Sequence, residues 1–249
     1  MRDALGFRYR MGIIAPSTNT IVEPEMNAMR PRGVTNHFAG IMVRNTPTPG
    51  DDEFAALMES IRRGMDEAVE SVMSAGVDRL IMGISSESFW GGLEASRKLD
   101  SDMLALTGGA PLTSAATAIT QALRDVYGVK RLAIMTPYAE VGDVHVRRFF
   151  EETGFDVVDI RGFRCQSPTA IAQVSNARIR ERVLELNKPD VECIVQLGTN
   201  LPFARLAGEA EFWLDKPVLA INTVIYWHAL RHSGITDPVD GFGSLLANH

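Results

Sequence analysis

Two pairs of similar segments constrain the fold of this chain more than any other feature of its sequence. Residues 10–19 (RMGIIAPSTN) parallel residues 131–139 (RLAIMTPYA), and residues 77–86 (VDRLIMGISS) parallel residues 191–200 (VECIVQLGTN). Each segment is an apolar run followed by small or polar residues, which is typical of a parallel strand and the loop after it. We therefore predict two similar α/β halves whose four strand-end loops converge on one cleft.

The composition excludes several classes of protein. Of 249 residues, 25 are Lys or Arg and 31 are Asp or Glu, so the net charge of −6 disfavours binding to nucleic acid or to an anionic membrane. No apolar run approaches the ~20 residues needed to span a bilayer, and we expect a cytoplasmic protein. The two cysteines, Cys165 and Cys193, form no CxxC motif and no His/Cys cluster with metal-ligand spacing, so we expect neither a metal nor a disulfide framework.

Strand-like apolar runs alternate with amphipathic helical stretches, which predicts an α/β fold with parallel sheets and crossover helices. We predict strands at about 10–15, 37–43, 78–83, 104–106, 130–135, 155–160, 192–197 and 217–221. We predict helices at about 52–75, 113–127, 141–153, 176–187, 201–213 and 223–233. The final helix is expected to cross back onto the first half. The N-terminal lobe then comprises residues 1–113 and 223–249, and the C-terminal lobe residues 114–222.

Polar residues at the strand ends are the candidates for binding. Ser17, Thr18 and Asn19 follow Pro16 and supply hydroxyl, amide and backbone N–H donors suited to a carboxylate or phosphate, although an ordinary helix-capping turn explains them as well. Glycines at two strand ends let a ligand approach the backbone, and the N–H groups after them can form an anion-binding nest. The residues concerned are Gly83 with Ser85 and Ser86, and Gly198 with Thr199 and Asn200. Tight turns are the alternative interpretation.

Tyr138 follows Thr136 and Pro137 at the fourth strand end, where its phenol is expected to project into the cleft. It can donate a hydrogen bond to a substrate carboxylate or to a developing enolate oxygen. The alternative is a half-buried packing residue.

These segments resemble a known group of enzymes. Residues 16–20 (PSTNT) with Glu23 resemble the Pro-Ser-Ser-Asn-Thr signature of maleate cis-trans isomerases, and residues 82–90 resemble the corresponding stretch of arylmalonate decarboxylases. Residues 136–138 resemble the tyrosine loop of both groups. The resemblance, from about Met11 to Gly234, implies the aspartate/glutamate racemase superfamily: two Rossmann-like lobes related by a pseudo-twofold axis, a cofactor-free active site between them and small carboxylic acids as substrates. It also suggests a homodimer or higher homo-oligomer. Asn176 occupies a place resembling a substrate-binding residue of the isomerases, with a helix N-cap as the alternative.

The chain departs from these families at their cysteines. The resemblance implies one catalytic cysteine at each symmetry-related strand end in isomerases and racemases, and only the second in decarboxylases. Here Gly83 and Gly198 stand at those positions, or alternatively Ser85 and Thr199 beside them, so we expect a reaction that does not use the family cysteine pair. Because an alcohol needs an adjacent base, a catalytic Ser85 or Ser86 would require a partner such as Glu87 or His228. A solvated surface position is the alternative for Glu87, and a packed or interface histidine for His228.

Three functions fit these residues. The first is a cofactor-independent enzyme in which the strand-end nests and Tyr138 stabilise an enolate- or oxyanion-like intermediate of a small carboxylic acid. A lyase ranks above an isomerase, because decarboxylation needs mainly anion stabilisation and a proton donor. The second is a hydrolase that uses Glu87 or an activated serine on a carbonyl substrate. The third is a non-catalytic protein that binds small carboxylates.

Overall fold

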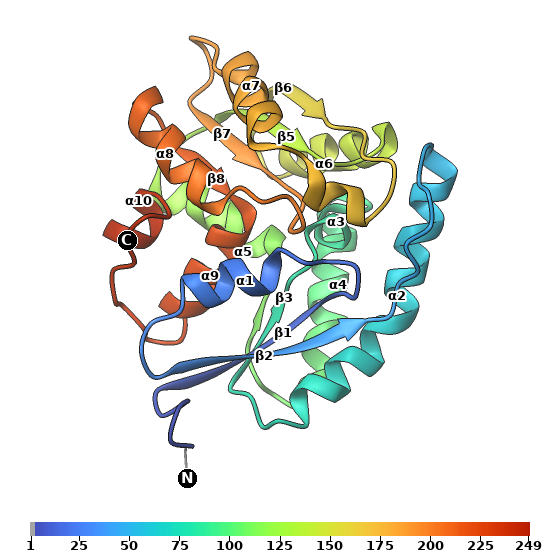
Figure 1. The fold of residues 1–249 in the computed structure, drawn as a ribbon, viewed down its shortest axis with the longest axis vertical. Helices are drawn as coiled ribbons and strands as arrows, with labels where there is room; N and C mark the ends of the chain where they lie inside the picture. Colours follow the sequence, from blue (N-terminus) through green and yellow to red (C-terminus); the bar gives the residue numbers. More distant parts are fainter. Residues whose placement is uncertain (1–2) are drawn as a thin grey trace.

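The computed structural model describes residues 3–249, and it contains two four-stranded parallel sheets, one in each half of the chain (Figure 1). The first sheet has the order β2-β1-β3-β4 and the second the order β6-β5-β7-β8. The strands are β1 (Tyr9–Pro16), β2 (Val34–Ile41), β3 (Arg79–Met82), β4 (Leu112–Thr113), β5 (Arg131–Thr136), β6 (Asp156–Gly162), β7 (Cys193–Gln196) and β8 (Val218–Ala220). The similar segments form β1 and β5, second in their sheets, and β3 and β7, third in theirs. The predicted pair of α/β halves is therefore confirmed.

Helices connect and cover these strands. They are α1 (Val22–Ala28), α2 (Asp51–Met73), α3 (Ser85–Phe89), α4 (Gly92–Leu106), α5 (Ala115–Gln121), α6 (Glu140–Glu152), α7 (Asn176–Leu186), α8 (Ala204–Leu214), α9 (Ile221–Arg231) and α10 (Ser244–Asn248). A π-helical turn, η1 (Ala122–Val126), extends α5, and a 3₁₀ turn, η2 (Thr169–Gln173), precedes α7. No helix in residues 3–249 combines the length and the apolar character required to cross a bilayer.

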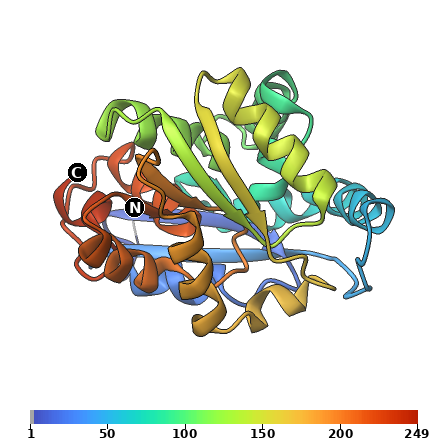
Figure 2. The same cartoon turned by 90° about the horizontal axis from the view of Figure 1, so that it is seen from above.

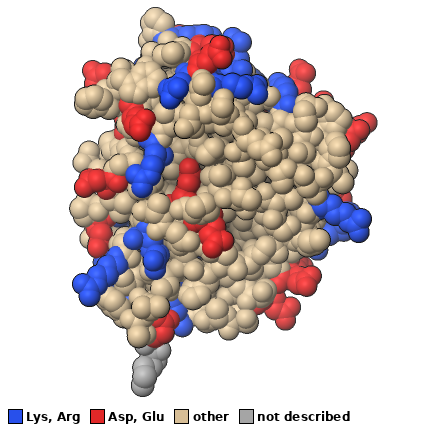
Figure 3. Space-filling view, in the orientation of Figure 1, with Lys and Arg blue, Asp and Glu red and all other residues tan. Residues whose placement is uncertain are grey.

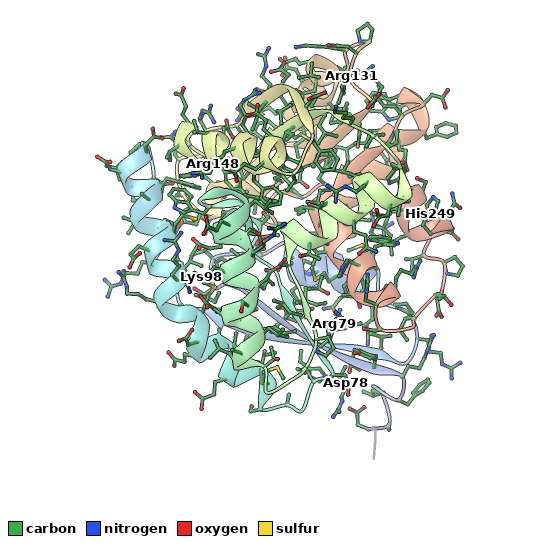
Figure 4. The ribbon with its side chains drawn as sticks, turned by 180° about the vertical axis from the view of Figure 1, so that it is seen from behind. Asp78, Arg79, Lys98, Arg131, Arg148 and His249 are labelled. Carbon is green, nitrogen blue, oxygen red and sulfur yellow. The ribbon has the colours of Figure 1, made fainter. Side chains whose placement is uncertain are left out.

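The carboxyl ends of the two sheets face each other. Arg79 begins β3 and Arg131 begins β5, and Figure 4 places Arg79 in the lower part of the first lobe and Arg131 at the far end of the second. The amino ends of the strands therefore point outward. The strand-end loops consequently meet at the junction of the lobes, which is where ligands bind in open parallel sheets.

Helix α2 forms because its apolar residues recur at helical spacing. Phe54, Met58, Ile61 and Met65 are buried along one face, and Asp51 is one of three acidic residues in the first turn, where negative charge favours the helix dipole. The views in Figures 1 and 2 place α2 at one edge of the molecule, opposite the C-terminal helices. The N-terminal half of α2 thus reaches the junction of the lobes.

Helix α9 follows the last strand of the second sheet but packs against α1, α5 and the first sheet. Its residues Ile221–Leu230 are all buried, as expected of a helix between two layers. The proposed division of the chain at residues 113/114 and 222/223 stays a prediction.

Two predicted elements differ from the structure. The run at 104–106 is not a strand but the end of α4, and the fourth strand of the first sheet is Leu112–Thr113. Leu104 and Leu106 are more than 40% exposed, so this apolar run does not mark a buried strand. Such a short run cannot be assigned to helix or strand from its hydrophobicity. The helix predicted at 113–127 is α5, which changes to a π-helical turn after Gln121.

Candidate active site

A cavity of about 60 Å³ lies where the strand ends of the two lobes meet. By the usual measure of space per buried water, it has room for roughly four to six water molecules, which is the size of a small organic acid. It is lined by Pro16, Thr18, Asn19, Phe54, Leu57, Met58, Ile61, Ile84, Ser85, Ser86, Tyr138, Pro168, Ile171, Gly198, Thr199 and Asn200. All four predicted strand-end loops therefore contribute to one pocket.

Ser85 and Tyr138 join the two lobes inside this pocket. Their hydroxyl oxygens lie 2.8 Å apart, and the backbone N–H of Gly198 donates to Ser85 Oγ at 2.9 Å. The Tyr138 ring packs against Phe54, with ring centroids 5.6 Å apart. Burial raises the pKa of Tyr138 far above its ordinary value, so the phenol remains a neutral hydrogen-bond donor at physiological pH.

The hydroxyl pair leaves one hydrogen free for a ligand. Two hydroxyl groups carry two hydrogens, and the bond between Ser85 and Tyr138 uses only one of them, whichever group donates. The Gly198 amide donates to Ser85 Oγ and so occupies one of the lone pairs of this oxygen. The remaining hydroxyl hydrogen of the pair is therefore best satisfied by an acceptor in the cavity. A carboxylate or enolate oxygen in the cavity is the natural partner for the remaining hydrogen.

A second set of contacts closes the pocket on its other side. Asn19 Nδ2 donates to Thr199 Oγ1 at 3.0 Å, and Thr199 Oγ1 donates to the carbonyl of Gly83 at 2.8 Å. Asn200 Oδ1 accepts from the N–H of Thr20 at 2.9 Å. These polar side chains link one lobe to the other, and they are only partly available to a ligand.

Several backbone N–H groups around the pocket, unlike these side chains, have no hydrogen-bond partner in the described part of the protein. Among the pocket-lining residues that the structure describes, the amides of Thr18, Ile84, Ser85, Ser86, Thr199 and Asn200 donate to no protein acceptor. The first amides of a helix such as α3 have no partner within the helix, and unpaired amides gathered around one cavity are suited to an anion. The predicted anion-binding nests thus have free donors on both lobes.

Glu25 and Asn222 support the Thr199 loop from behind. Glu25 accepts the amides of Phe203 and Ala204 at 3.0 Å and the side-chain amide of Asn222 at 2.7 Å. Asn222 also donates to the carbonyl of Thr199 at 2.9 Å. Burial raises the pKa of Glu25, while these three donors favour its charged form. Sequence reasoning did not single out either residue, because their partners lie far away in the chain.

The apolar wall of the pocket was also absent from the sequence-based candidates. Phe54, Leu57, Met58 and Ile61 come from α2, whose helical spacing indicated only a core-facing helix. Among the described residues, no charged side chain lines the cavity. Figure 3 shows a broad uncharged area to the right of the centre of this face and a group of acidic side chains just left of the centre. Any anion bound in the cavity is held by neutral donors next to an aliphatic surface.

Glu87 is not brought to this pocket. It is buried, its Oε2 accepts a hydrogen bond from Arg62 Nε at 2.8 Å, and burial raises its pKa against the opposing effect of Arg62. It lies two positions after Ser85 on α3, and residues two apart on a helix do not share a face. Its predicted role as a base for a pocket serine therefore has no support in the geometry.

Three predicted binding residues also lie outside the lining. Ser17 is exposed, and its hydroxyl contacts the backbone of Val43 at 3.0 Å. Gly83 contributes its carbonyl to Thr199 from behind the pocket wall. Asn176 is an exposed first residue of α7, a helix that Ser175 caps. A strand-end position alone does not determine which side of the loop a side chain occupies.

Neither cysteine lines the cavity. Cys193 is fully buried within β7, and burial raises its pKa strongly. Cys165 lies in the loop after β6, where burial raises its pKa to about 11. Both thiols therefore remain protonated at neutral pH, and neither is placed to act as a thiolate in this pocket.

His228, the other proposed partner for a serine, lies on α9 and does not line the pocket. It is buried, its Nδ1 is 3.1 Å from Thr113 Oγ1, and its ring stacks on His232 at 4.1 Å. Burial, then the neighbouring His232 and Arg79, lower its pKa to about 3. His228 is thus a neutral packing residue.

This histidine makes stability depend on pH. Below pH 6.5 the unfolded chain binds a proton at this position, whereas the folded protein does not until about pH 3, so stability falls as the pH falls through this window. Linkage predicts a loss of about 2 kcal/mol from pH 7 to pH 5 for this one group. Urea unfolding of wild type and His228→Asn at both values tests this, since Asn retains a polar partner for Thr113 and cannot titrate. An equal pH dependence in both proteins would contradict it.

Comparison with known proteins agrees with the fold. The family model described as arylmalonate decarboxylase matches residues 11–246. A maleate isomerase of Nocardia farcinica is 28% identical over 97% of this chain and 96% of its own. A mutant of the Nocardia farcinica maleate cis-trans isomerase with a covalently bound succinylcysteine intermediate superposes with a TM-score of 0.87, at 23% identity over 97% of this chain and 99% of that one. A crystal structure of arylmalonate decarboxylase has a TM-score of 0.78, at 21% identity over 96% and 100%. Because the family model covers nearly the whole sequence, the chain belongs to the arylmalonate decarboxylase family.

Proposed function

We propose that the protein is a cofactor-independent lyase that removes CO2 from a small carboxylic acid in the pocket between its lobes. The observation that carries this proposal is the Ser85–Tyr138 hydroxyl pair, which retains a hydrogen for an anionic oxygen. The unpaired amides of both lobes and the neutral, partly aliphatic lining support it. The family and the maleate isomerase relatives, enzymes of the lyase and isomerase types, support the same reaction class.

The chemistry follows from the donors present. When the C–C bond to a carboxylate breaks, CO2 leaves and the bonding electrons remain on the α-carbon, delocalised onto the oxygen of an adjacent carboxyl or carbonyl group. The Ser85–Tyr138 pair and the pocket amides then stabilise charge on that enolate oxygen, next to the aliphatic side chains of α2. The α-carbon finally takes up one proton, from a pocket hydroxyl or from water, so the acid anion and one proton yield CO2 and the product.

The cysteine positions favour a lyase over an isomerase of the thiol-addition type. The succinylcysteine seen in the Nocardia farcinica enzyme requires a cysteine at the substrate, whereas Cys165 and Cys193 both lie outside this pocket. A hydrolase that uses Glu87 has less support, because that carboxylate is paired with Arg62 instead of a pocket serine. A protein that only binds carboxylates is the remaining alternative, and turnover distinguishes it.

Thermal-shift measurements with maleate, fumarate, malonate and phenylmalonate, followed by NMR of each incubated acid, test the proposal. We expect at least one malonate to raise the melting temperature of the wild type and to be converted. Ser85→Ala is expected to reduce both effects. Stabilisation by several acids with no change in any spectrum would instead support a binding protein.

A further inference from the structure

The loop that carries Tyr138 is held along its whole length by one neighbouring segment. Residues 163–165 donate to three successive carbonyl oxygens of residues 136–138. The bonds run from the Phe163 amide to Thr136 O (2.8 Å), from the Cys165 amide to Pro137 O (3.0 Å) and from the Arg164 guanidinium to Tyr138 O (2.9 Å). Only the last of these bonds depends on a side chain, and it reaches the catalytic candidate itself.

Arg164 also closes a ring of polar contacts around Tyr138. The same Nη1 atom that donates to the Tyr138 carbonyl forms an ion pair with Asp143. Asp143 accepts a hydrogen bond from the Thr136 hydroxyl, and Thr136 Oγ1 accepts from the Tyr138 amide at 3.2 Å. Both backbone groups of Tyr138 are therefore tied to one buried carboxylate.

The backbone conformation of Arg164 is energetically unfavourable. Arg164 has φ = +53°, in the left-handed region that non-glycine residues seldom adopt. Gly162 leaves room for the side chain, because a Cβ at that position would overlap the guanidinium. Gly142 likewise leaves room for the Tyr138 side chain, whose Cβ would lie 2.7 Å from an added methyl group. Strain of this kind persists where surrounding structure enforces it, often at functional sites.

We propose that Arg164 and Asp143 are positioning residues that aim the Tyr138 hydroxyl at Ser85; this rests on the function proposed above. The phenol oxygen lies at the far end of a rigid ring, so a small rotation of the Tyr138 backbone produces a larger displacement at the hydroxyl. A displacement of about 1 Å at a reacting group costs as much as a hundredfold in rate. Arg164 itself touches no substrate and acts through Tyr138.

The variant Arg164→Gly distinguishes the positioning of Tyr138 from a contribution of Arg164 to the stability of the fold. Glycine accepts the positive φ without strain and removes both side-chain contacts, so the relief of strain offsets part of the lost ion pair. We expect kcat to fall about ten- to a hundredfold with KM changed less than about threefold. Asp143→Asn, which weakens the same contacts from the other side, is expected to change kcat in the same direction.

Asp159→Asn is the matched control. Asp159 lies on β6 and pairs with Lys188 at 2.6 Å, so it is also a largely buried carboxylate in an ion pair of the second lobe. No contact connects it to Tyr138, and we expect its replacement to leave kcat unchanged even where the melting temperature falls. A control that lowers kcat as much as Arg164→Gly would overturn the proposal.

A spectroscopic measurement tests the positioning role independently of turnover. The chain has four tyrosines, so the ¹⁹F NMR spectrum of protein labelled with 3-fluorotyrosine has four environments, and Tyr138→Phe assigns the signal of Tyr138. We expect that signal to shift or broaden in Arg164→Gly and to remain in place in Asp159→Asn. An unmoved signal, or a moved one with unchanged kcat, would overturn the proposal. If the wild type converts no acid, the proposed function fails, and the ¹⁹F signal alone decides whether Arg164 holds Tyr138.

Discussion

Tyr138→Phe is expected to lower turnover of the protein's acid substrate by about a hundred- to a thousandfold, the usual cost of removing one oxyanion donor. The substitution removes only the phenol oxygen, which lies 2.8 Å from Ser85 Oγ, and keeps the ring that packs on Phe54. The Gly198 amide still has Ser85 Oγ as its acceptor, so we expect the fold to lose only about 1 kcal/mol, the net value of an ordinary hydrogen bond. Steady-state kinetics and urea unfolding of the same preparation measure both quantities.

Ser85→Ala should reduce turnover to a similar extent, because the two hydroxyls act as one donor unit. The double variant should then lose little more than the single variants, as is typical of groups that function together. Ser88→Ala is the control on the same helix, since the Ser88 hydroxyl is buried but bonds only the carbonyl of Ile84. Turnover of Tyr138→Phe within threefold of the wild type would show that the hydroxyl pair does not stabilise the reacting anion.

Gly198→Ala is expected to give the largest loss of stability of any single methyl addition near the site. Gly198 has φ = +94°, and a Cβ there would overlap the ring of Pro137 in the loop of Tyr138. A left-handed backbone costs about 1–2 kcal/mol for a residue with a Cβ, and overpacking adds about 1–3 kcal/mol, so we expect a loss of about 2–5 kcal/mol. The same shift of Pro137 would also displace Tyr138 and reduce turnover.

Gly154→Ala supplies the control for this prediction. Gly154 has a similar φ of +89°, but nothing lies within 4 Å of the position of an added Cβ. Its replacement therefore reports the backbone strain alone, about 1–2 kcal/mol. Equal losses in the two variants, measured by urea unfolding, would mean that Pro137 and Gly198 are not tightly packed against each other.

The duplicated strand-end segments carried most of the information about the fold. Apolar runs that end in Pro16, Gly83, Pro137 and Gly198 predicted which strands are equivalent, and the sheet orders confirm that equivalence. The predicted strand at 104–106 was wrong because a short apolar run fits the amphipathic end of a helix as well as a strand. Periodicity is thus informative for long elements and ambiguous for short ones.

The site was predictable to the extent that it follows from strand ends. Ser85, Tyr138 and Thr199 meet because parallel strands bring their carboxyl ends to one edge of each sheet, and these edges of the two sheets face each other. The direction of Glu87 depends on the rotation of the five-residue helix α3, which no pattern in the sequence determines. The α2 wall and the Arg164–Asp143 pair depend on packing between distant segments, and local sequence holds no signal for such contacts.

The strand-end residues have two roles that are coupled. The contacts of Asn19 with Thr199 and of Thr20 with Asn200 hold the lobes together, and the same loops present the unpaired amides. An anion that binds those amides therefore also strengthens the closed arrangement of the lobes. This coupling is the physical basis for expecting that an acid raises the melting temperature before any reaction occurs.

The most direct test of the proposed reaction is ¹³C NMR of the wild-type protein in D2O with malonates labelled at both carboxyl carbons. The hydroxyl-pair account predicts labelled CO2 or bicarbonate and a product with one deuterium on the carbon that lost the carboxyl group. Conversion of maleate to fumarate, with no labelled CO2 from any malonate, would contradict it and indicate an isomerase.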